Sequence, residues 1–126
     1  MSFAVRQSPH EVYRRVDFDA RVAGADAREL VSLCCEQLSE SLGTAIHAHR
    51  AGDHLLRSRS LTRAISAATA LQIGVSGEDA MARTLHDLYG ATRRALLDSV
   101  PDFDTVRLAG IRDDFREIGS AMRSLA

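Results

Sequence analysis

The sequence contains no tryptophan and no lysine, and its aromatic residues are two tyrosines and four phenylalanines in 126 positions. So few aromatic rings do not make the stacking platform typical of proteins that bind single-stranded nucleic acids. All 16 basic residues are arginines, so neither a Schiff-base lysine nor a phosphate-loop lysine is available. The formal net charge is −1 and no basic block stands out. We therefore expect no nucleic-acid partner.

Cysteine is also scarce. The two cysteines, Cys34 and Cys35, are adjacent in the sequence. Two adjacent cysteines in a helix cannot form a disulfide bond with each other, and the sequence has no Cys-x-x-Cys pair. We therefore interpret both cysteines as reduced core residues. No stretch approaches the roughly 20 apolar residues of a membrane span, and the N-terminus lacks a signal-like apolar run. These absences predict a soluble, cytoplasmic protein without membrane insertion.

The residues that could carry catalysis or bind metal are also poorly placed. His47 and His49 diverge on a helix and cannot share an ion, and no Glu-x-x-His pair exists for a di-iron centre. The acidic residues fall on faces expected to be solvated, which leaves no paired carboxylates for acid–base chemistry. We expect no cofactor, no metal and no enzymatic activity.

Apolar residues recur at steps of three and four along four long segments, which predicts an all-α domain. Asp26 with Glu29 resembles a capping box and predicts a helix from about Ala27 to about Ala51. Gly52 followed by Asp53 predicts a tight reversal into a second helix, about His54 to Ile73. Ser76 with Asp79 resembles another capping box and predicts a third helix that begins near Gly77 or Glu78 and runs to Val100.

The third and fourth segments each carry a full apolar stripe. In the third, the side expected to be buried holds Met81, Leu85, Leu88, Thr92, Ala95 and Leu96. Pro101 ends that helix, and Asp102 is expected to cap a fourth from about Phe103 to Ser124. The fourth is expected to bury Leu108, Ile111, Phe115, Ile118, Met122 and Leu125.

Together these segments predict an antiparallel, up-down four-helix bundle over residues 25–126. We expect residues 1–24 to form a separate N-terminal segment, in which Ser8 and Pro9 predict the start of a short amphipathic helix with Tyr13 and Val16 on its apolar side. A helix so short is marginal in water and needs a surface on which to dock.

The segment from Ser60 to Gln72 is dominated by alanine, serine and threonine. Its small side chains fit two alternatives, either close packing within the bundle or a groove for a partner helix. On the third helix, Gly90 and Leu97 fall away from the expected core stripe and Tyr89 lies at its margin. One interpretation of Gly90 and Leu97 is that the backbone of a partner approaches closely at Gly90. The alternative is that both are surface residues without a role in binding.

One motif suggests signalling chemistry. The run His86-Asp87-Leu88-Tyr89-Gly90 resembles the motif of histidine phosphotransfer domains, which are also four-helix bundles and carry an exposed histidine with a glycine four residues on. That family usually has lysine where this chain has Tyr89. Phosphotransfer through His86 is therefore the alternative function.

Several stretches together resemble another family. They are Tyr13, then ELVSLCCEQL at 29–38, AGD at 51–53, TALQIGVSGEDAM at 69–81 and TLHDLYGATRRALLDS at 84–99. In this order and spacing they are similar to the flagellin-export chaperone family, FliS, over nearly the whole chain from Tyr13. The family tends to have Leu-Tyr-Asp-Gly where this chain has Leu33-Cys34-Cys35-Glu36.

This resemblance implies a cytoplasmic chaperone that binds the disordered C-terminal segment of flagellin, prevents premature polymerisation and presents its client to the flagellar type III export gate. It also implies that the N-terminal helix covers an apolar groove and yields to the client. The expected partner-binding residues are Tyr13, Val16, Leu61, Ile65, Ala68, Leu71, Gln72, Tyr89, Gly90 and Leu97.

Overall fold

The computed structural model describes residues 27–124, so the predicted N-terminal helix with Tyr13 and Val16, and the predicted core residue Leu125, lie outside the described residues. The described part consists of four helices without a strand: α2 (Ala27–Ala51), α3 (His54–Gly74), α4 (Ala80–Asp98) and α5 (Thr105–Ser124). The all-α prediction is confirmed for this range.

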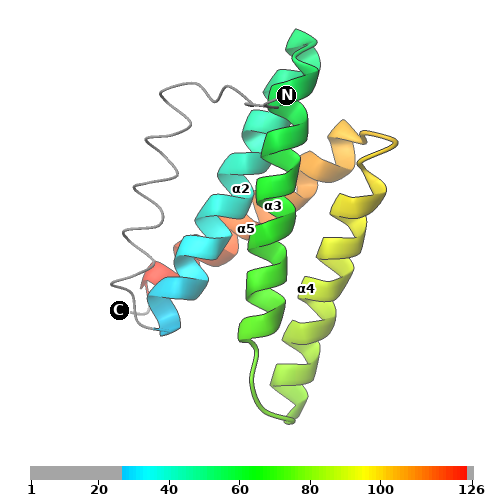
Figure 1. The fold of residues 1–126 in the computed structure, drawn as a ribbon. Coiled ribbons are helices and arrows are strands. Elements are labelled where there is room, and N and C mark those ends of the chain that lie inside the picture. Colours follow the sequence, from blue (N-terminus) through cyan, green and yellow to red (C-terminus); the bar gives the residue numbers. More distant parts are fainter. Residues whose placement is uncertain (1–26, 125–126) are drawn as a thin grey trace, which may run out of the picture.

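The helices pack as a partial bundle in which α2 is central. Figure 1 shows α2, α3 and α4 side by side, with α5 crossing behind them at an angle. The extensive interfaces join α2 to α3, α2 to α5 and α3 to α4, whereas α4 and α5 have little contact with each other. As a result, α4 is held mainly by α3, which decides the side of α4 that is buried.

The turn between α2 and α3 forms as its residues predict. Gly52 adopts a positive φ of 72°, which a glycine accepts without a side-chain clash. Asp53 then caps α3, because its carboxylate accepts a hydrogen bond from the Leu56 backbone N–H at 3.1 Å. The prediction of a tight reversal at these two residues is confirmed.

The predicted starts of α4 and α5 were wrong by two or three residues. The cap of α4 is Asp79 rather than Ser76, and its carboxylate accepts from the Ala82 backbone N–H at 2.7 Å. Gly77, with a φ of 95°, lies outside helical geometry, so the helix begins only beyond it. At α5, Asp104 rather than Asp102 accepts from the Arg107 backbone N–H at 3.0 Å, and the helix begins at Thr105.

Phe103 lies in the loop before α5, where its ring contacts the last turn of α2 and the first turn of α3. It stacks on His49, with 4.4 Å between the ring centroids, and the Arg57 guanidinium lies 5.6 Å from the Phe103 ring centroid. Arg57 also shares a 3.0 Å hydrogen bond with His49 Nδ1. These contacts tie the loop between α4 and α5 to the same end of the molecule as the turn between α2 and α3.

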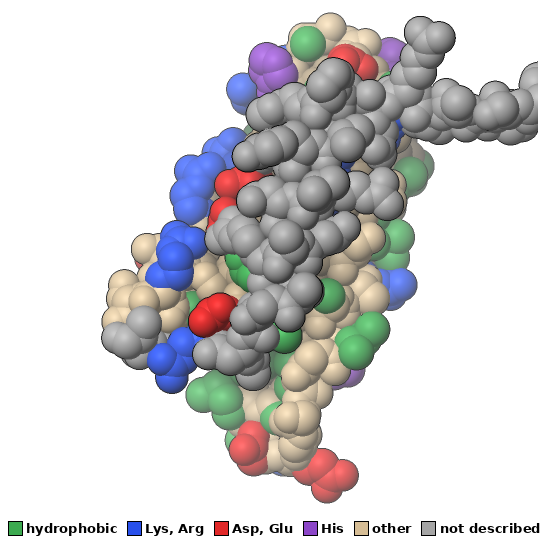
Figure 2. Space-filling model, turned by 60° about the vertical axis from the view of Figure 1, so that its left-hand side comes forward, with side chains coloured by type: hydrophobic (Ala, Val, Ile, Leu, Met, Phe, Trp, Pro, Cys, Tyr) green, Lys and Arg blue, Asp and Glu red, His purple; other side chains and the backbone are tan. Residues whose placement is uncertain are grey.

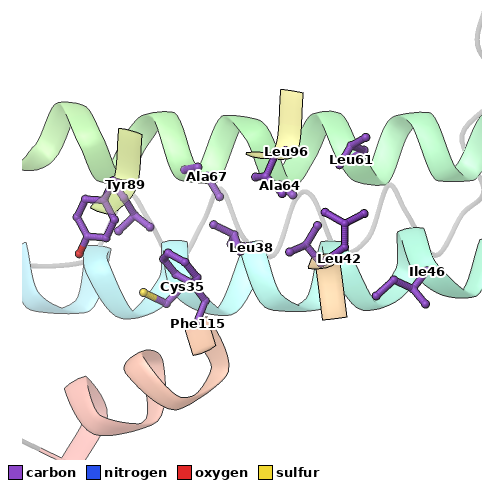
Figure 3. Close-up of a cluster of buried hydrophobic side chains, with 13 residues drawn as sticks. Cys35, Leu38, Leu42, Ile46, Leu61, Ala64, Ala67, Tyr89, Leu96 and Phe115 are labelled. Atoms are coloured by element: carbon purple, nitrogen blue, oxygen red, sulfur yellow. The ribbon is translucent and has the colours of Figure 1, made fainter. Parts of the chain in front are cut away.

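The core lies between α2 and its neighbours, with Leu38, Leu42, Leu96 and Leu108 fully buried. Figure 3 shows Leu38 and Leu42 of α2 lying opposite the small side chains of Ala64 and Ala67 on α3. Burial of each leucine stabilises the fold by roughly 1.5–3 kcal/mol.

The burial pattern of α4 differs from the predicted stripe. Met81 and Leu88 are 67% and 42% exposed, whereas Tyr89 is only 5% exposed and Gly90 is buried. The physical reason is that α4 packs on α3 rather than on α5, which turns the buried side of α4 toward α3. Thr92, Ala95 and Leu96 are buried as predicted.

The burial pattern of α5 follows the prediction only in part. Leu108 and Phe115 are buried, but Ile111, Ile118 and Met122 are half-buried because α4 does not cover them. The apolar side of α5 is therefore shared between the core and an open surface.

Candidate functional site

A cleft with a volume of ≈ 1140 Å³ is lined by residues of all four described helices. Its volume exceeds the usual range of small-molecule pockets, about 300–1,000 Å³. Apolar side chains contribute most of the lining: Leu30, Val31 and Cys34 of α2, Ala67, Ala70 and Leu71 of α3, Val75 of the following loop, Met81, Ala82, Leu85 and Tyr89 of α4, and Ile118 and Met122 of α5. The cleft is thus suited to a large apolar ligand such as a peptide.

One wall of the cleft is a ridge of small side chains on α3. Ser58, Thr62, Ser66, Ala70 and Gly74 follow one another at steps of four and all line the cleft. This spacing places them in one row along the helix. Because none is larger than threonine, a second helix can approach the α3 backbone closely here.

Tyr89 forms part of the floor of the cleft. Figure 3 shows its ring reaching from α4 to the space between α2 and α3, and its centroid lies 6.3 Å from that of Phe115. Burial raises the pKa of the Tyr89 phenol, and the nearby Cys35 and Cys34 thiols add to this effect. Tyr89 therefore contributes a neutral aromatic surface at physiological pH.

The two cysteines keep the α2 side of the floor uncharged. Cys34 lines the cleft, and burial raises the pKa of its thiol. Cys35 lies fully buried behind it, and burial, together with the neighbouring Cys34 thiol, raises the pKa of Cys35 to about 12. Both thiols are free and stay protonated at neutral pH, as expected for small apolar core residues.

An exposed apolar edge adjoins the cleft where α3 ends and α4 begins. Met81 lines the cleft although 67% of it is exposed, and Ile73 at the end of α3 is 78% exposed. Methionine adapts its shape to different partners. Exposed apolar side chains beside an apolar cleft are typical of a surface that another molecule covers.

Of the predicted partner-binding residues that the structure describes, Leu71 and Tyr89 line this cleft and the others do not. Leu61 and Ala68 instead lie in the core, where they are 4% and 0% exposed. Tyr13 and Val16 lie outside the described residues. The sequence prediction placed the partner on the row that includes Leu61 and Ala68, whereas the cleft uses the ridge of small side chains on another side of α3.

The remaining predicted residues lie between α3 and α4 or near their contact. A Cβ atom at Gly90 would lie 2.8 Å from Gln72 Nε2, so Gly90 leaves room for the Gln72 side chain. The expectation that Gly90 faces outward was therefore wrong. Ile65 is half-buried, and Leu97 is 40% exposed on the side of α4 that carries Gly90.

Other kinds of site receive no support. His86 is an exposed residue on α4. Residues 27–124 hold no cluster of three or more His, Cys, Asp or Glu side chains able to bind a metal ion. Within the same residues, no helix combines the length and apolar character needed to cross a bilayer.

A helical fold with a large, mostly apolar cleft and an exposed apolar edge has the features of a protein-binding module. The chain matches the family model described as flagellar protein FliS over residues 9–125, and it belongs to this family. The resemblance to the flagellar export chaperones is thereby confirmed, and the match gives no support to phosphotransfer. No curated protein matches the chain.

Proposed function

We propose that this flagellar export chaperone works in the cytoplasm, where it binds the disordered C-terminal segment of flagellin in the cleft. Binding keeps the segment from polymerising before export, and the complex is delivered to the flagellar type III export gate. The observation that carries this proposal is the combination of a broad apolar floor with the ridge of small side chains at 58–74 on α3.

The energetics of such a client require a large apolar surface. A disordered segment that folds on binding spends about 2–5 kcal/mol of its interaction energy on becoming ordered. The cleft can supply this because apolar side chains of α2, α4 and α5 converge in it, and Leu85, Ile118 and Met122 are only partly buried in the free chain. Coverage of these side chains by a client helix removes further apolar area from water.

The proposal includes a role for the N-terminal segment. In it, a short helix with Tyr13 and Val16 on its apolar side covers the client groove of an antiparallel, up-down bundle and leaves when the client arrives. The sequence motivates this role through the amphipathic pattern around these residues and the link at Val22-Ala23-Gly24. If deletion of residues 1–22 changed neither client affinity nor amide exchange along the cleft, this part of the proposal would be wrong.

A steric block in the cleft tests the function. Ala70 is exposed, lines the cleft and belongs to the ridge, so Ala70→Trp fills the cleft without disturbing the core. The matched control is Ala91→Trp, at an exposed position of α4 that does not line the cleft. Each protein is mixed with a flagellin C-terminal fragment at micromolar concentration and analysed by size exclusion with light scattering.

The wild-type and Ala91→Trp proteins are expected to form a one-to-one complex and to delay flagellin polymerisation, whereas Ala70→Trp does neither. Failure of the wild-type protein to form a complex would overturn the proposed function. Equal binding by the two tryptophan variants would show that the client binds elsewhere.

A further inference from the structure

The sulfur-containing side chains gather at the cleft. Residues 27–124 contain two cysteines and two methionines. Cys34, Met81 and Met122 line the cleft, and Cys35 is fully buried next to Cys34 in α2. The three lining residues belong to α2, α4 and α5, so sulfur reaches the same cleft from three helices. An oxidant that enters this cleft therefore meets all the sulfur of the part of the chain that the structure describes.

The two methionines are the more accessible of these side chains. Met81 is 67% exposed and Met122 is half-buried, whereas Cys35 is fully buried. Figure 2 shows hydrophobic side chains exposed at the lower end of the molecule, where α3 ends and α4 begins in Figure 1. Met81 is the second residue of α4, so it lies at this open end of the cleft.

The thiols are protected in a way that the thioethers are not. Peroxides attack the thiolate form of a cysteine. Burial raises the pKa of the Cys34 thiol and raises the pKa of Cys35 to about 12, so both stay protonated at neutral pH. A thioether has no proton to lose before it reacts, and its exposure therefore sets its reactivity. This difference directs oxidation to Met81 first and to Met122 second.

Oxidation reverses the character of a methionine side chain. The thioether sulfur attacks one oxygen of hydrogen peroxide, the O–O bond breaks, an S–O bond forms and water leaves, so sulfur is oxidised and peroxide is reduced. The sulfoxide that results is polar. Leu85 lies one helical turn beyond Met81 and also lines the cleft. A client helix that covers both side chains must then bury a polar oxygen in an apolar contact, which is unfavourable.

We propose that Met81 and Met122 are modification sites through which peroxide oxidation weakens client binding in the cleft. The inference rests on the proposed binding of flagellin and adds its regulation. The change is reversible, because methionine sulfoxide reductases remove the oxygen as water while two thiols are oxidised to a disulfide. Oxidation thus releases the client, and reduction restores the apolar surface.

The order of oxidation tests the first part of the proposal without a client. The full chain is treated with increasing amounts of hydrogen peroxide, the reaction is stopped with catalase, and the modified residues are located by peptide mass spectrometry. Met81 is expected to reach half conversion at a lower dose than Met122, with Cys34 and Cys35 unmodified at that dose. Earlier oxidation of Met122 or of either cysteine would contradict the proposal.

The affinity of the oxidised chain tests the second part. After removal of peroxide, the flagellin C-terminal fragment is added and Kd is measured by isothermal titration. Oxidation is expected to raise Kd on the order of tenfold, and treatment with reductases for both sulfoxide epimers is expected to restore the original value. An unchanged Kd, or a loss that the reductases do not reverse, would overturn the proposal.

The matched control is the double variant Met81→Leu/Met122→Leu, which keeps apolar side chains of similar volume but removes both thioethers. Met1 and both cysteines remain, so oxidation elsewhere in the chain affects both proteins alike. Each protein is compared with its own untreated sample. Peroxide is expected to change the Kd of the double variant by less than about twofold, as expected when no cleft thioether remains. An equal rise in both proteins would show that another residue is responsible.

Two further readouts separate this proposal from its alternatives. Far-UV circular dichroism of the oxidised chain is expected to match that of the untreated chain, and a loss of helix would show that oxidation acts through unfolding, against the proposal. If the untreated chain does not bind the fragment, the proposed function fails together with its regulation. If the untreated chain binds and peroxide changes nothing, the function stands and the regulation alone is overturned.

Discussion

Met81 offers the clearest separation between binding and folding. It lines the cleft, yet 67% of it is exposed, so the fold gains little from this side chain while a bound client can cover it. We therefore predict that Met81→Ala weakens binding of the flagellin C-terminal segment and leaves the free chain nearly as stable as before.

The expected size follows from the exposed fraction. Full burial of a methionine side chain is worth roughly 1.5–3 kcal/mol, and about two-thirds of that remains to be gained when a client covers Met81. The loss on truncation is then roughly 1–2 kcal/mol, which raises Kd about 5- to 30-fold. The free energy of unfolding is expected to change by less than about 0.5 kcal/mol, as for other exposed positions.

Isothermal titration with the flagellin fragment measures the affinity, and urea unfolding measures the stability. The matched control is Val106→Ala, which removes an apolar side chain that is 84% exposed on α5 and does not line the cleft. Its affinity for the fragment is expected to equal that of the wild type. The reasoning is refuted if Met81→Ala binds as tightly as the wild type, or if Val106→Ala loses as much affinity.

Three further predictions concern the fold. Leu38→Ala removes a fully buried side chain and is expected to lower the free energy of unfolding by about 2–5 kcal/mol in urea, and a loss below about 1 kcal/mol would contradict the core described above. Gly119→Ala places a Cβ 3.2 Å from Cys35 Cβ, whereas the new Cβ of Gly110→Ala meets nothing within 4 Å. Both gain up to about 1 kcal/mol of helix propensity, so thermal melting should show Gly110→Ala as the more stable, and the reverse order would refute tight packing of α5 on α2. Because the pKa of Cys35 rises from 9.0 to about 12 on folding, the unfolded chain loses this proton first, so stability falls above pH 9 by up to about 1.4 kcal/mol per pH unit. Urea titrations between pH 8 and 10.5 should show a shallower decline for Cys35→Ala, and equal slopes would contradict the burial of this thiol.

The sequence predicted best what depends on neighbouring residues. The reversal at Gly52 and Asp53 forms as predicted because a glycine at positive φ and a capping aspartate act within a few residues of themselves. The same local logic failed at Ser76, because Asp79 three residues later is also a strong cap and the positive φ of Gly77 keeps the chain out of the helix until then. Two adequate caps in one loop leave the start of a helix ambiguous.

The face that α4 buries could not be read from its own sequence. The periodic pattern offered Met81 and Leu88 as core residues, but the choice depends on whether α3 or α5 lies closer. Because α3 lies closer to α4, Tyr89 and Gly90 are buried, whereas Met81 and Leu88 are left exposed. A pattern along one helix contains no information about the position of its neighbours.

The cleft was predictable only in part for the same reason. Leu71 and Tyr89 were predicted to contact the partner and both line the cleft, but two other lining residues, Ile118 and Met122, come from a helix about thirty residues beyond Tyr89. One signal was present in the sequence: small residues at every fourth position from Ser58 to Gly74. Such a row predicts a smooth helix face, although it does not reveal what covers it.

The most direct measurement is a map of backbone amide shifts when unlabelled flagellin C-terminal fragment is added to the isotope-labelled chain. The largest changes are expected along the walls of the cleft, from Leu30 to Gln37, from Ser58 to Val75 and from Met81 to Tyr89. Little change is expected in the loop between α4 and α5, around Val100. Changes centred on that loop, or an unchanged spectrum at saturating fragment, would contradict the assignment of this cleft as the client-binding site.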